Sequence, residues 1–217
     1  MSYSMTKSSS IFKENCEFMP IYKKTLDPRE KELLRIIYKS EFIREILDRA
    51  HELNLPQWHL GAGCIAQTVW NSMHGYDLMT NIKDFDFVYY DPDLSGDKEQ
   101  LMSEQVKTLF AHLPVELDVV NEARVHLWYE EYFGHSINPY KSSADAISTW
   151  PTTATSVGIT CSSDKVISIE APYGLEDLLS MVVRANKKQI TEEIYLKKVE
   201  RWTRVWPRLT VVPWHTK

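Results

Sequence analysis

The sequence predicts a single domain that combines α-helices with β-strands. Apolar residues alternate with acidic ones in two segments, which is the period of a half-buried strand. In three longer segments apolar residues recur every three or four positions, which is the period of an amphipathic helix. The strand pattern covers residues 83–91 and 115–120, and the helix pattern covers residues 28–53, 97–113 and 191–206.

Length and composition indicate the domain organisation. With 217 residues, of which 43% are hydrophobic, the chain is long enough to bury one large core. We expect a loose arm over residues 1–20, which lack periodicity, and one domain over residues 21–217. The core of that domain is expected at about residues 55–125, and a helical C-terminal part at about residues 174–208.

Charge is unevenly distributed along the chain, whose formal net charge is -5. Residues 83–131 contain 12 acidic and four basic residues, whereas residues 184–217 contain nine basic and three acidic ones. The net charge disfavours a general nucleic-acid binder. The uneven distribution fits either solvated helix faces or a metal-binding centre beside a surface that attracts phosphate.

Cysteine usage and the N-terminus indicate the compartment. Cys16, Cys64 and Cys161 are odd in number and widely spaced, which favours a reducing compartment over a disulfide or zinc framework. Residues 1–10 are polar, and no run approaches the roughly 18 apolar residues of a membrane span. We therefore expect a cytoplasmic protein without a membrane partner.

A strand, a glycine turn and a helix are expected in the first half of the chain. The first helical pattern begins at Pro28, after a capping residue at Asp27, and ends before Pro56 as one long helix or two short ones. Residues 57–60 form a short apolar run that leads into the glycine turn at residues 61–63. Helical periodicity returns directly after that turn.

The glycine turn, formed by Gly61, Ala62 and Gly63, has a possible use in binding. Small residues let phosphates approach the backbone, and the first turn of a helix offers unpaired amides and the positive end of a dipole. A tight turn without a ligand explains these residues equally well. The chain has neither a GxGxxG nor a GxxxxGK[ST] motif, so a Rossmann or Walker site is not supported.

Two carboxylates lie close together on the first predicted strand. Successive side chains of a strand point to opposite faces, so Asp84 and Asp86 share one face while Phe85 and Phe87 occupy the other. The α-carbons of the two aspartates are expected about 7 Å apart, within reach of one divalent cation or a pair of them. Asp91, by contrast, fits the opening of the Asp-Pro turn that follows.

A third carboxylate is expected on the next strand. The helix over residues 97–113 ends at Pro114, and the strand after it places Glu116 and Asp118 on one face. Asp118 is the better third member, because Glu116 lies nearer the strand start. Three close acids can hold two magnesium ions for phosphoryl chemistry, whereas without metal they repel one another. The alternative is that these acids only solvate an exposed sheet face.

The order of these motifs resembles the nucleotidyltransferase superfamily with the polymerase-beta type of catalytic fold, and more closely a small nucleotidyltransferase-like family within it. The resemblance covers about residues 30–208. The segments that carry it are residues 61–63 with Val69-Trp70, residues 84–91, residues 121–126, residues 142–151 and residues 171–178.

The resemblance implies an α+β fold with a mixed sheet flanked by helices. It also implies transfer of a nucleoside monophosphate from a nucleoside triphosphate to an unknown acceptor, which is a small molecule, a protein or RNA, with Mg²⁺ or Mn²⁺ as the cofactor. The turn at residues 61–63 would receive phosphates, while Asp84, Asp86 and Asp118 would hold metal. One departure is Ala62, which stands where the superfamily usually has Gly or Ser.

Three residues after the second strand are further candidates. Arg124 either contacts a phosphate of the nucleotide or forms a structural ion pair, and we include it among the nucleotide-binding residues. Asn121 or His126 would orient a base or ribose. For His126 a buried and hydrogen-bonded structural role is the favoured alternative.

The last third of the chain is expected to alternate helices with a hairpin. Ser142 and Asp145 fit the cap of a short helix that ends near Trp150. Residues 154–161 and 165–170 fit a β-hairpin, and residues 175–183 fit a short helix.

The final helix, over residues 191–206, carries an aromatic stripe and a basic face. The stripe fits core packing better than base stacking, and the basic face is expected outward, where it would guide a nucleic-acid or phosphorylated acceptor. The stripe consists of Tyr195, Val199, Trp202 and Trp206, and the basic face of Lys197, Lys198, Arg201 and Arg204.

Three hypotheses follow. The first is a magnesium-dependent nucleotidyltransferase in which Asp84, Asp86 and Asp118 are catalytic and bind metal. The second is a non-catalytic nucleotide-binding or regulatory module with the same fold, which Ala62 favours because a hydroxyl is absent there. The third is an interaction domain, which would bind no nucleotide in a metal-dependent way.

Overall fold

The computed structural model describes residues 26–216, and the core of the fold is one five-stranded sheet. The arm predicted over residues 1–20, and with it Cys16, lies outside the described residues. The strands are β1 (His59–Gly61), β2 (Asp84–Tyr89), β3 (Glu116–Asn121), β4 (Gly158–Cys161) and β5 (Ile167–Glu170).

The sheet is mixed, as predicted. Its strand order is β3-β2-β1-β4-β5, and β2 pairs with β3 in parallel while the other neighbours are antiparallel. A parallel pair needs a crossover, and α4 (Gly96–Leu109) supplies it between β2 and β3. The predicted hairpin at the other edge of the sheet is formed by β4 and β5.

The N-terminal helical segment divides into two helices. α1 (Pro28–Ile37) begins with a capping box at Asp27, whose side chain accepts hydrogen bonds from the amides of Arg29 and Glu30. α2 (Glu41–Arg49) begins at its own cap, Ser40, and continues as a 3-10 turn, η1 (Ala50–Leu53). The second cap explains why one long helix does not form.

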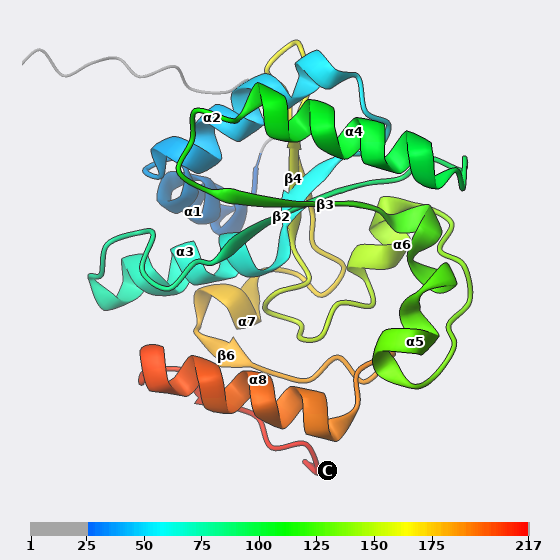
Figure 1. Cartoon of the computed structure of the whole chain (residues 1–217). Helices are drawn as coiled ribbons and strands as arrows, with labels where there is room; N and C mark the ends of the chain where they lie inside the picture. Colours follow the sequence, from blue (N-terminus) through cyan, green and yellow to red (C-terminus); the bar gives the residue numbers. More distant parts are fainter. Residues whose placement is uncertain (1–25, 217) are drawn as a thin grey trace, which may run out of the picture.

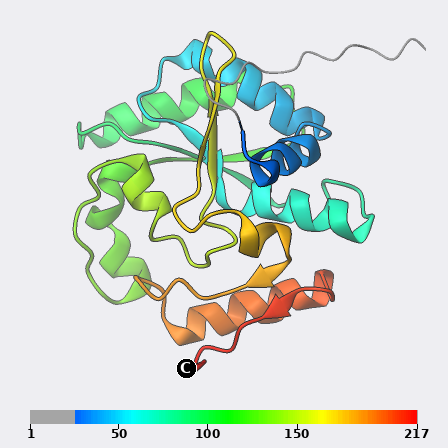
Figure 2. The ribbon, with the colours of Figure 1, turned by 180° about the vertical axis from the view of Figure 1, so that it is seen from behind.

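The helices pack on the sheet and on one another. α3 (Ala62–His74) packs against β2 and α1, and α4 packs against β3. Figure 1 shows α2 and α4 at the top of the view and α8 (Glu192–Val205) at the bottom, with the sheet between them. Figure 2 shows the same layers from behind.

Short elements connect the sheet to α8. They are η2 (Glu122–Leu127), α5 (Tyr129–Phe133), α6 (Ser143–Ile147), α7 (Glu176–Leu179), β6 (Val182–Val183) and, after α8, β7 (Thr210–Val211). The cap predicted at Ser142 is present, because its hydroxyl accepts a hydrogen bond from the amide of Asp145.

The helix predicted over residues 175–183 is wrong in its second half. α7 ends at Leu179, and Met181 adopts a positive φ of 55°, which ends the helix. Val182 and Val183 instead form β6, which pairs in parallel with β7. Tertiary pairing with a distant segment overrides the local helical pattern there.

The aromatic stripe of α8 is core, as predicted. Tyr195, Trp202 and Trp206 are buried, and the rings of both tryptophans pack edge-on against Trp70 of α3. The indole of Trp206 donates a hydrogen bond of 2.7 Å to the side chain of Asn71. α8 is therefore fixed to α3, the helix that follows the glycine turn.

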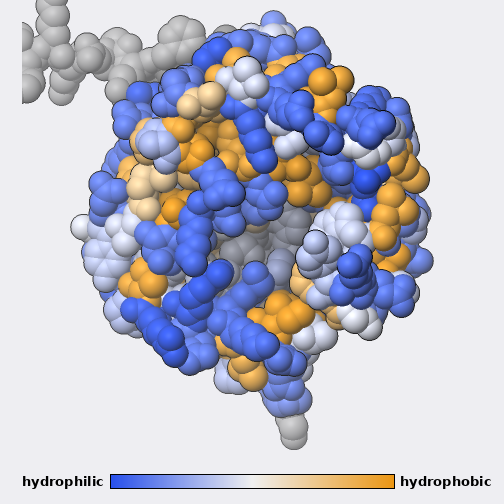
Figure 3. Space-filling model, in the orientation of Figure 1, coloured by the Kyte–Doolittle hydropathy of each residue, from blue (hydrophilic) through white to orange (hydrophobic). Residues whose placement is uncertain are grey.

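The described cysteines, Cys64 and Cys161, are free and buried. Over residues 26–216 none of the helices combines the length and apolar character that crossing a bilayer requires. Figure 3 shows a surface of mixed polar and apolar side chains that is hollowed near its centre.

Candidate active site

β2 places the two aspartates on one face of the sheet. Phe85 and Phe87 are buried on the opposite face, where the ring of Phe87 stacks on Trp58 at 5.5 Å. Asp84 is exposed and Asp86 is half-buried. The alternation read from the sequence is thus present, and the buried phenylalanines hold the carboxylates in their orientation.

The parallel register places further acids beside them. Asp86 lies opposite Asp118, and Asp84 lies opposite Glu116. Residues in register on neighbouring strands, about 4.8 Å apart, point to the same face. The structure therefore brings together the three predicted carboxylates, and Glu116 lies one step further along the same face.

Burial and the negative charge of Asp84 raise the pKa of two carboxyl groups, those of Asp86 and Asp118. The pKa of Asp86 is raised to about 7, first by burial and then by the negative charge of Asp84. The pKa of Asp118 is also raised, by burial and by the same neighbour. Concentrated negative charge of this kind favours the binding of a proton or a cation.

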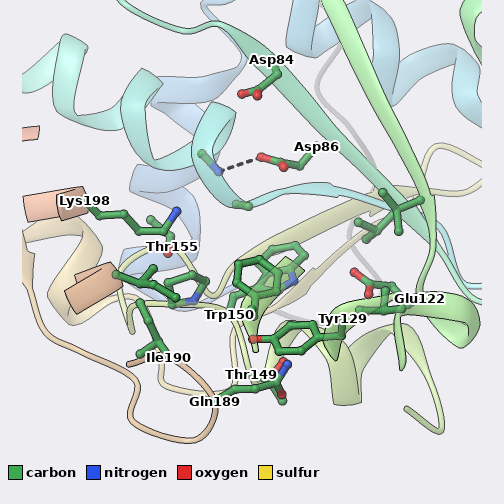
Figure 4. A pocket seen from close by; sticks show the side chains of 18 of the residues that line it. Asp84, Asp86, Glu122, Tyr129, Thr149, Trp150, Thr155, Gln189, Ile190 and Lys198 are labelled. Carbon is green, nitrogen blue, oxygen red and sulfur yellow. Dashed lines mark hydrogen bonds between the residues drawn. The ribbon is translucent and has the colours of Figure 1, made fainter. Parts of the chain in front are cut away.

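The glycine turn contacts the carboxylate strand directly. The amide of Gly63 donates a hydrogen bond of 3.1 Å to Oδ2 of Asp86 (Figure 4), and the amide of Ala62 donates to the carbonyl of Val157 at 3.0 Å. Both amides therefore have partners within the protein. Ala62 and Gly63 line a cavity, and their predicted contact with phosphates remains a prediction.

Gly61 has a packing role. A Cβ atom at this position would lie 2.6 Å from the carbonyl oxygen of Val157 and 2.8 Å from the ring of Trp150. The glycine is required because β1 passes close to the segment that contains these residues. Gly61 is also absent from the described residues that line the cavity.

The cavity has a volume of about 440 Å³ and lies between the sheet and α8. Figure 4 shows Asp84 and Asp86 on one wall, Lys198 on another, and a group of aromatic and polar side chains away from Asp84. The residues at this end of the cavity include Glu122, Tyr129, Tyr140, Thr149, Trp150 and Gln189.

The structure divides the basic face predicted on α8. Lys197 forms an ion pair of 2.6 Å with Glu193, and Arg204 forms one with Glu200, so these two face solvent. Lys198 and Arg201 instead line the cavity.

The spacing of residues in α8 could have shown that its basic side chains lie on two different faces. Ile194, Lys198 and Arg201 are separated by four and three residues, so they form one stripe directly beside the aromatic stripe. All three line the cavity.

Lys198 is partly buried in the wall of the cavity that α8 forms. Its pKa is lowered, first by burial and then by the positive charge of Arg201, while Asp86 and Asp84 oppose the shift. Its ammonium also lies 5.8 Å from the ring centroid of Trp202. The cavity thus has carboxylates on one wall and two cationic side chains on another.

Glu122 was not identified from the sequence. It follows β3 directly, lines the cavity and is only 4% exposed. Burial, followed by the charge of Asp86, raises its pKa to about 8, and a hydrogen bond from the side chain of Trp150 opposes the shift. The sequence signal that could have identified Glu122 is its position directly after β3, a strand that carries two acidic residues.

Arg124 lies outside the cavity, and of its two predicted roles the structure favours the ion pair. Its Nε atom lies 2.7 Å from Glu99 of α4, and its guanidinium also donates to the carbonyl of Leu94. The side chain therefore connects η2 to α4 and the loop before it. It is not among the described residues that line the cavity.

Asn121 and His126 are also outside that lining. The side chain of Asn121 donates to the carbonyl of Asp91 and accepts from the amides of Asp91 and Ala123, so it fixes the end of β2. Nδ1 of His126 is buried without a hydrogen-bond partner among the described residues. The predicted turn at Asp91 is confirmed, because its carboxylate accepts from the amide of Asp93.

Asp84 and Asp86 offer carboxylate oxygens, which are the kind of ligand that Mg²⁺ takes. Within residues 26–216 no group of three or more His, Cys, Asp or Glu side chains is close enough to hold a metal ion by itself. Mg²⁺ usually keeps several waters and takes one or two carboxylates together with substrate phosphates. Asp84 and Asp86 meet that requirement as oxygen ligands on one strand face.

The fold has a close structural relative. An NMR structure described as a CCA-adding enzyme head domain matches with a TM-score of 0.68 and 26% sequence identity, covering 84% of this chain and 95% of that chain. A tRNA-processing enzyme in an apo form matches with a TM-score of 0.48 and 15% identity, covering 89% of this chain and 46% of that one. No curated protein sequence shows a significant match.

The mixed sheet and the helices around it have the fold of a nucleotidyltransferase head domain. The sequence agrees with the fold, because residues 48–211 match a family described as Nucleotidyltransferase. This chain belongs to that family.

Proposed function

We propose that this protein is a magnesium-dependent enzyme that transfers a nucleoside monophosphate from a nucleoside triphosphate to an acceptor hydroxyl. The observation that carries the proposal is the pairing of Asp84 and Asp86 on one face of β2 with Asp118 in register on β3. Asp84 and Asp86 line a cavity that is also lined by Lys198 and Arg201.

Asp84 and Asp86 would hold the metal, with Asp118 beside them. When bound, Mg²⁺ neutralises the phosphates and lowers the pKa of an attacking hydroxyl. Asp118 would accept the proton of the acceptor hydroxyl, since its carboxylate has a raised pKa and lies next to the metal-binding pair.

Lys198 and Arg201 would bind the triphosphate from the opposite wall. Both are cationic, and both line the cavity that Asp84 and Asp86 also line, so they would contact the phosphates of a nucleotide bound there. Their charge would also stabilise the departing pyrophosphate. For Lys198 and Arg201 this role replaces the outward position that the sequence predicted, which Lys197 and Arg204 keep.

The acceptor is a molecule with a free hydroxyl group. RNA is the first acceptor to test, because the structural relative is described as a CCA-adding enzyme head domain. Small molecules and proteins are the alternatives.

A second candidate is a nucleotide-binding module without catalysis. Ala62 favours it, because this residue has no hydroxyl and its amide is already bonded to Val157. Tight triphosphate binding without pyrophosphate release would support the module over the enzyme.

The test is incubation of the full chain with each labelled triphosphate, Mg²⁺ and a pool of RNA. We expect pyrophosphate release and labelled acceptor. The double variant Asp84→Asn plus Asp86→Asn should lose both, while Asp164→Asn, an exposed residue of the turn between β4 and β5, should keep them. Equal activity of the double variant and the wild type would contradict the proposal.

A further inference from the structure

We propose that Gln67 is a phosphate-binding residue, whose side-chain amide donates a hydrogen bond to the triphosphate from the part of the cavity wall that α3 forms. The inference rests on the proposed function, and it adds a hydrogen-bond donor next to the carboxylates. It gives to a side chain the role that the sequence suggested for the backbone of the glycine turn.

Gln67 is a buried polar side chain without a partner in the protein. It belongs to α3, lines the cavity and is only 8% exposed. Its amide has both a donor group and an acceptor oxygen, and within residues 26–216 neither takes part in a hydrogen bond. Most polar groups that proteins bury are hydrogen-bonded, so this exception requires an explanation.

The amide is also accessible from the cavity. In the part of the chain that the structure describes, some side-chain atoms are fully buried without a partner, for example at Thr68 and Trp70, but none belongs to Gln67. Its nitrogen and oxygen therefore keep some contact with the open space that Gln67 lines. A ligand in the cavity can reach them without a rearrangement of the core.

The position of the amide indicates which part of a ligand it contacts. A Cβ atom added at Gly63 would lie 3.0 Å from Nε2 of Gln67 and 3.4 Å from Oδ2 of Asp86. Gln67 thus reaches back by one turn towards the start of α3, as helical side chains do. Its donor lies beside a carboxylate that is proposed to hold Mg²⁺, and phosphates of a nucleotide bind next to that ion.

The backbone of the glycine turn has no such free donor at its first two positions in the helix. The amides of Ala62 and Gly63 already donate to Val157 and Asp86, and Ala62 has no hydroxyl. The N–H groups of Gln67 lie near the same end of the helix and remain unused. A neutral amide suits this place, because a lysine or arginine would pair with Asp86.

Calorimetric titration of the full chain in Mg²⁺ with the four common ribonucleoside triphosphates tests this inference. Gln67→Met replaces the amide with an apolar group of similar length and helix propensity. We expect it to bind every triphosphate that the wild type binds about tenfold more weakly, and by the same factor, because the phosphates are common to all four.

Two further variants complete the titration. Gln67→Glu adds a negative charge beside Asp86 and the phosphates, so it should weaken binding more than Gln67→Met does. Gln105→Met, the same substitution at an exposed residue of α4, is the matched control and should bind like the wild type.

Thermal melts of the ligand-free variants distinguish binding from a structural role. A buried amide without a partner in the protein does not stabilise the fold, so the Tm of Gln67→Met should equal or exceed that of the wild type. A glutamine that supports the fold would give a lower Tm together with weaker binding.

Four results would overturn the inference and leave the proposed function intact. They are unchanged affinity in Gln67→Met, losses that differ between the triphosphates, wild-type affinity in Gln67→Glu, and a lower Tm in Gln67→Met. Failure of the wild type to bind any of the four triphosphates in Mg²⁺ would overturn both.

Discussion

The amide of Gly63 donates a hydrogen bond of 3.1 Å to the carboxylate of Asp86, which connects the first turn of α3 to the middle of β2. The two motifs are 23 residues apart in the sequence and form one site in the structure. The contact lowers the pKa of Asp86, but burial and the charge of Asp84 outweigh it. Asp86 therefore retains a proton up to near neutral pH.

This proton should affect stability. The pKa of Asp86 rises from 3.8 in the unfolded chain to about 7 in the folded one, so between these values the folded state binds the proton more tightly. Its contribution to stability is present below about pH 4 and is lost as the pH rises to about 7. Asp86→Asn should therefore be more stable than the wild type at pH 8, and this gain should shrink at pH 5. Urea denaturation at both values measures it, and an equal effect at both would contradict it.

Magnesium should stabilise the protein more at high pH than at low pH. Protons and Mg²⁺ compete for the same carboxylates, so the gain in Tm on adding Mg²⁺ should be larger at pH 8 than at pH 6. Thermal melts with and without the ion provide the measurement. In Asp84→Asn plus Asp86→Asn the gain should vanish, and its persistence there would place the ion elsewhere.

The two faces of α8 should differ in their effect on nucleotide binding. Lys198→Ala should weaken triphosphate binding about tenfold, since it removes a charged hydrogen-bond donor from the cavity. Lys197→Ala is the matched control on the adjacent residue, which is ion-paired to Glu193 in solvent. Calorimetry measures both affinities. A loss that is equal in the two variants would indicate general electrostatic attraction instead of a contact in the cavity.

Gly61 should tolerate no side chain. Gly61→Ala would place Cβ 2.6 Å from the backbone oxygen of Val157, so we expect a loss of about 2 kcal/mol or more of unfolding free energy. Gly75→Ala is a control of a different kind, because a Cβ there contacts nothing but the φ of 70° is unfavourable. It should cost about 1 kcal/mol. Chemical denaturation compares the two, and equal losses would contradict the steric explanation.

Arg124 should matter for stability and not for nucleotide binding. Arg124→Ala would leave Glu99 without its partner at 2.7 Å, and we expect a loss of about 2 kcal/mol of unfolding free energy. Triphosphate affinity should stay within a factor of about two, because this side chain lies outside the cavity lining. A marked fall in affinity in a folded variant would restore the role in nucleotide binding that the sequence suggested.

Local patterns were sufficient for the carboxylate strands. The alternation of Asp84 and Asp86 with Phe85 and Phe87 depends only on the period of a strand, so the shared face could be predicted from sequence. The same holds for Asp118 on the next strand. Residues 175–183 were harder, because the pairing of β6 with β7 depends on a segment nearly thirty residues away.

Local sequence patterns establish which residues carry charge, which faces are apolar, and the order of strand, turn and helix around the three aspartates. Which charged residues meet depends on how the elements pack in three dimensions. This packing turned Lys198 and Arg201 into the cavity, buried Glu122 against Trp150 and paired Arg124 with Glu99. The reason is physical: a side chain's period along its own helix or strand is local, whereas its partners depend on how distant elements pack.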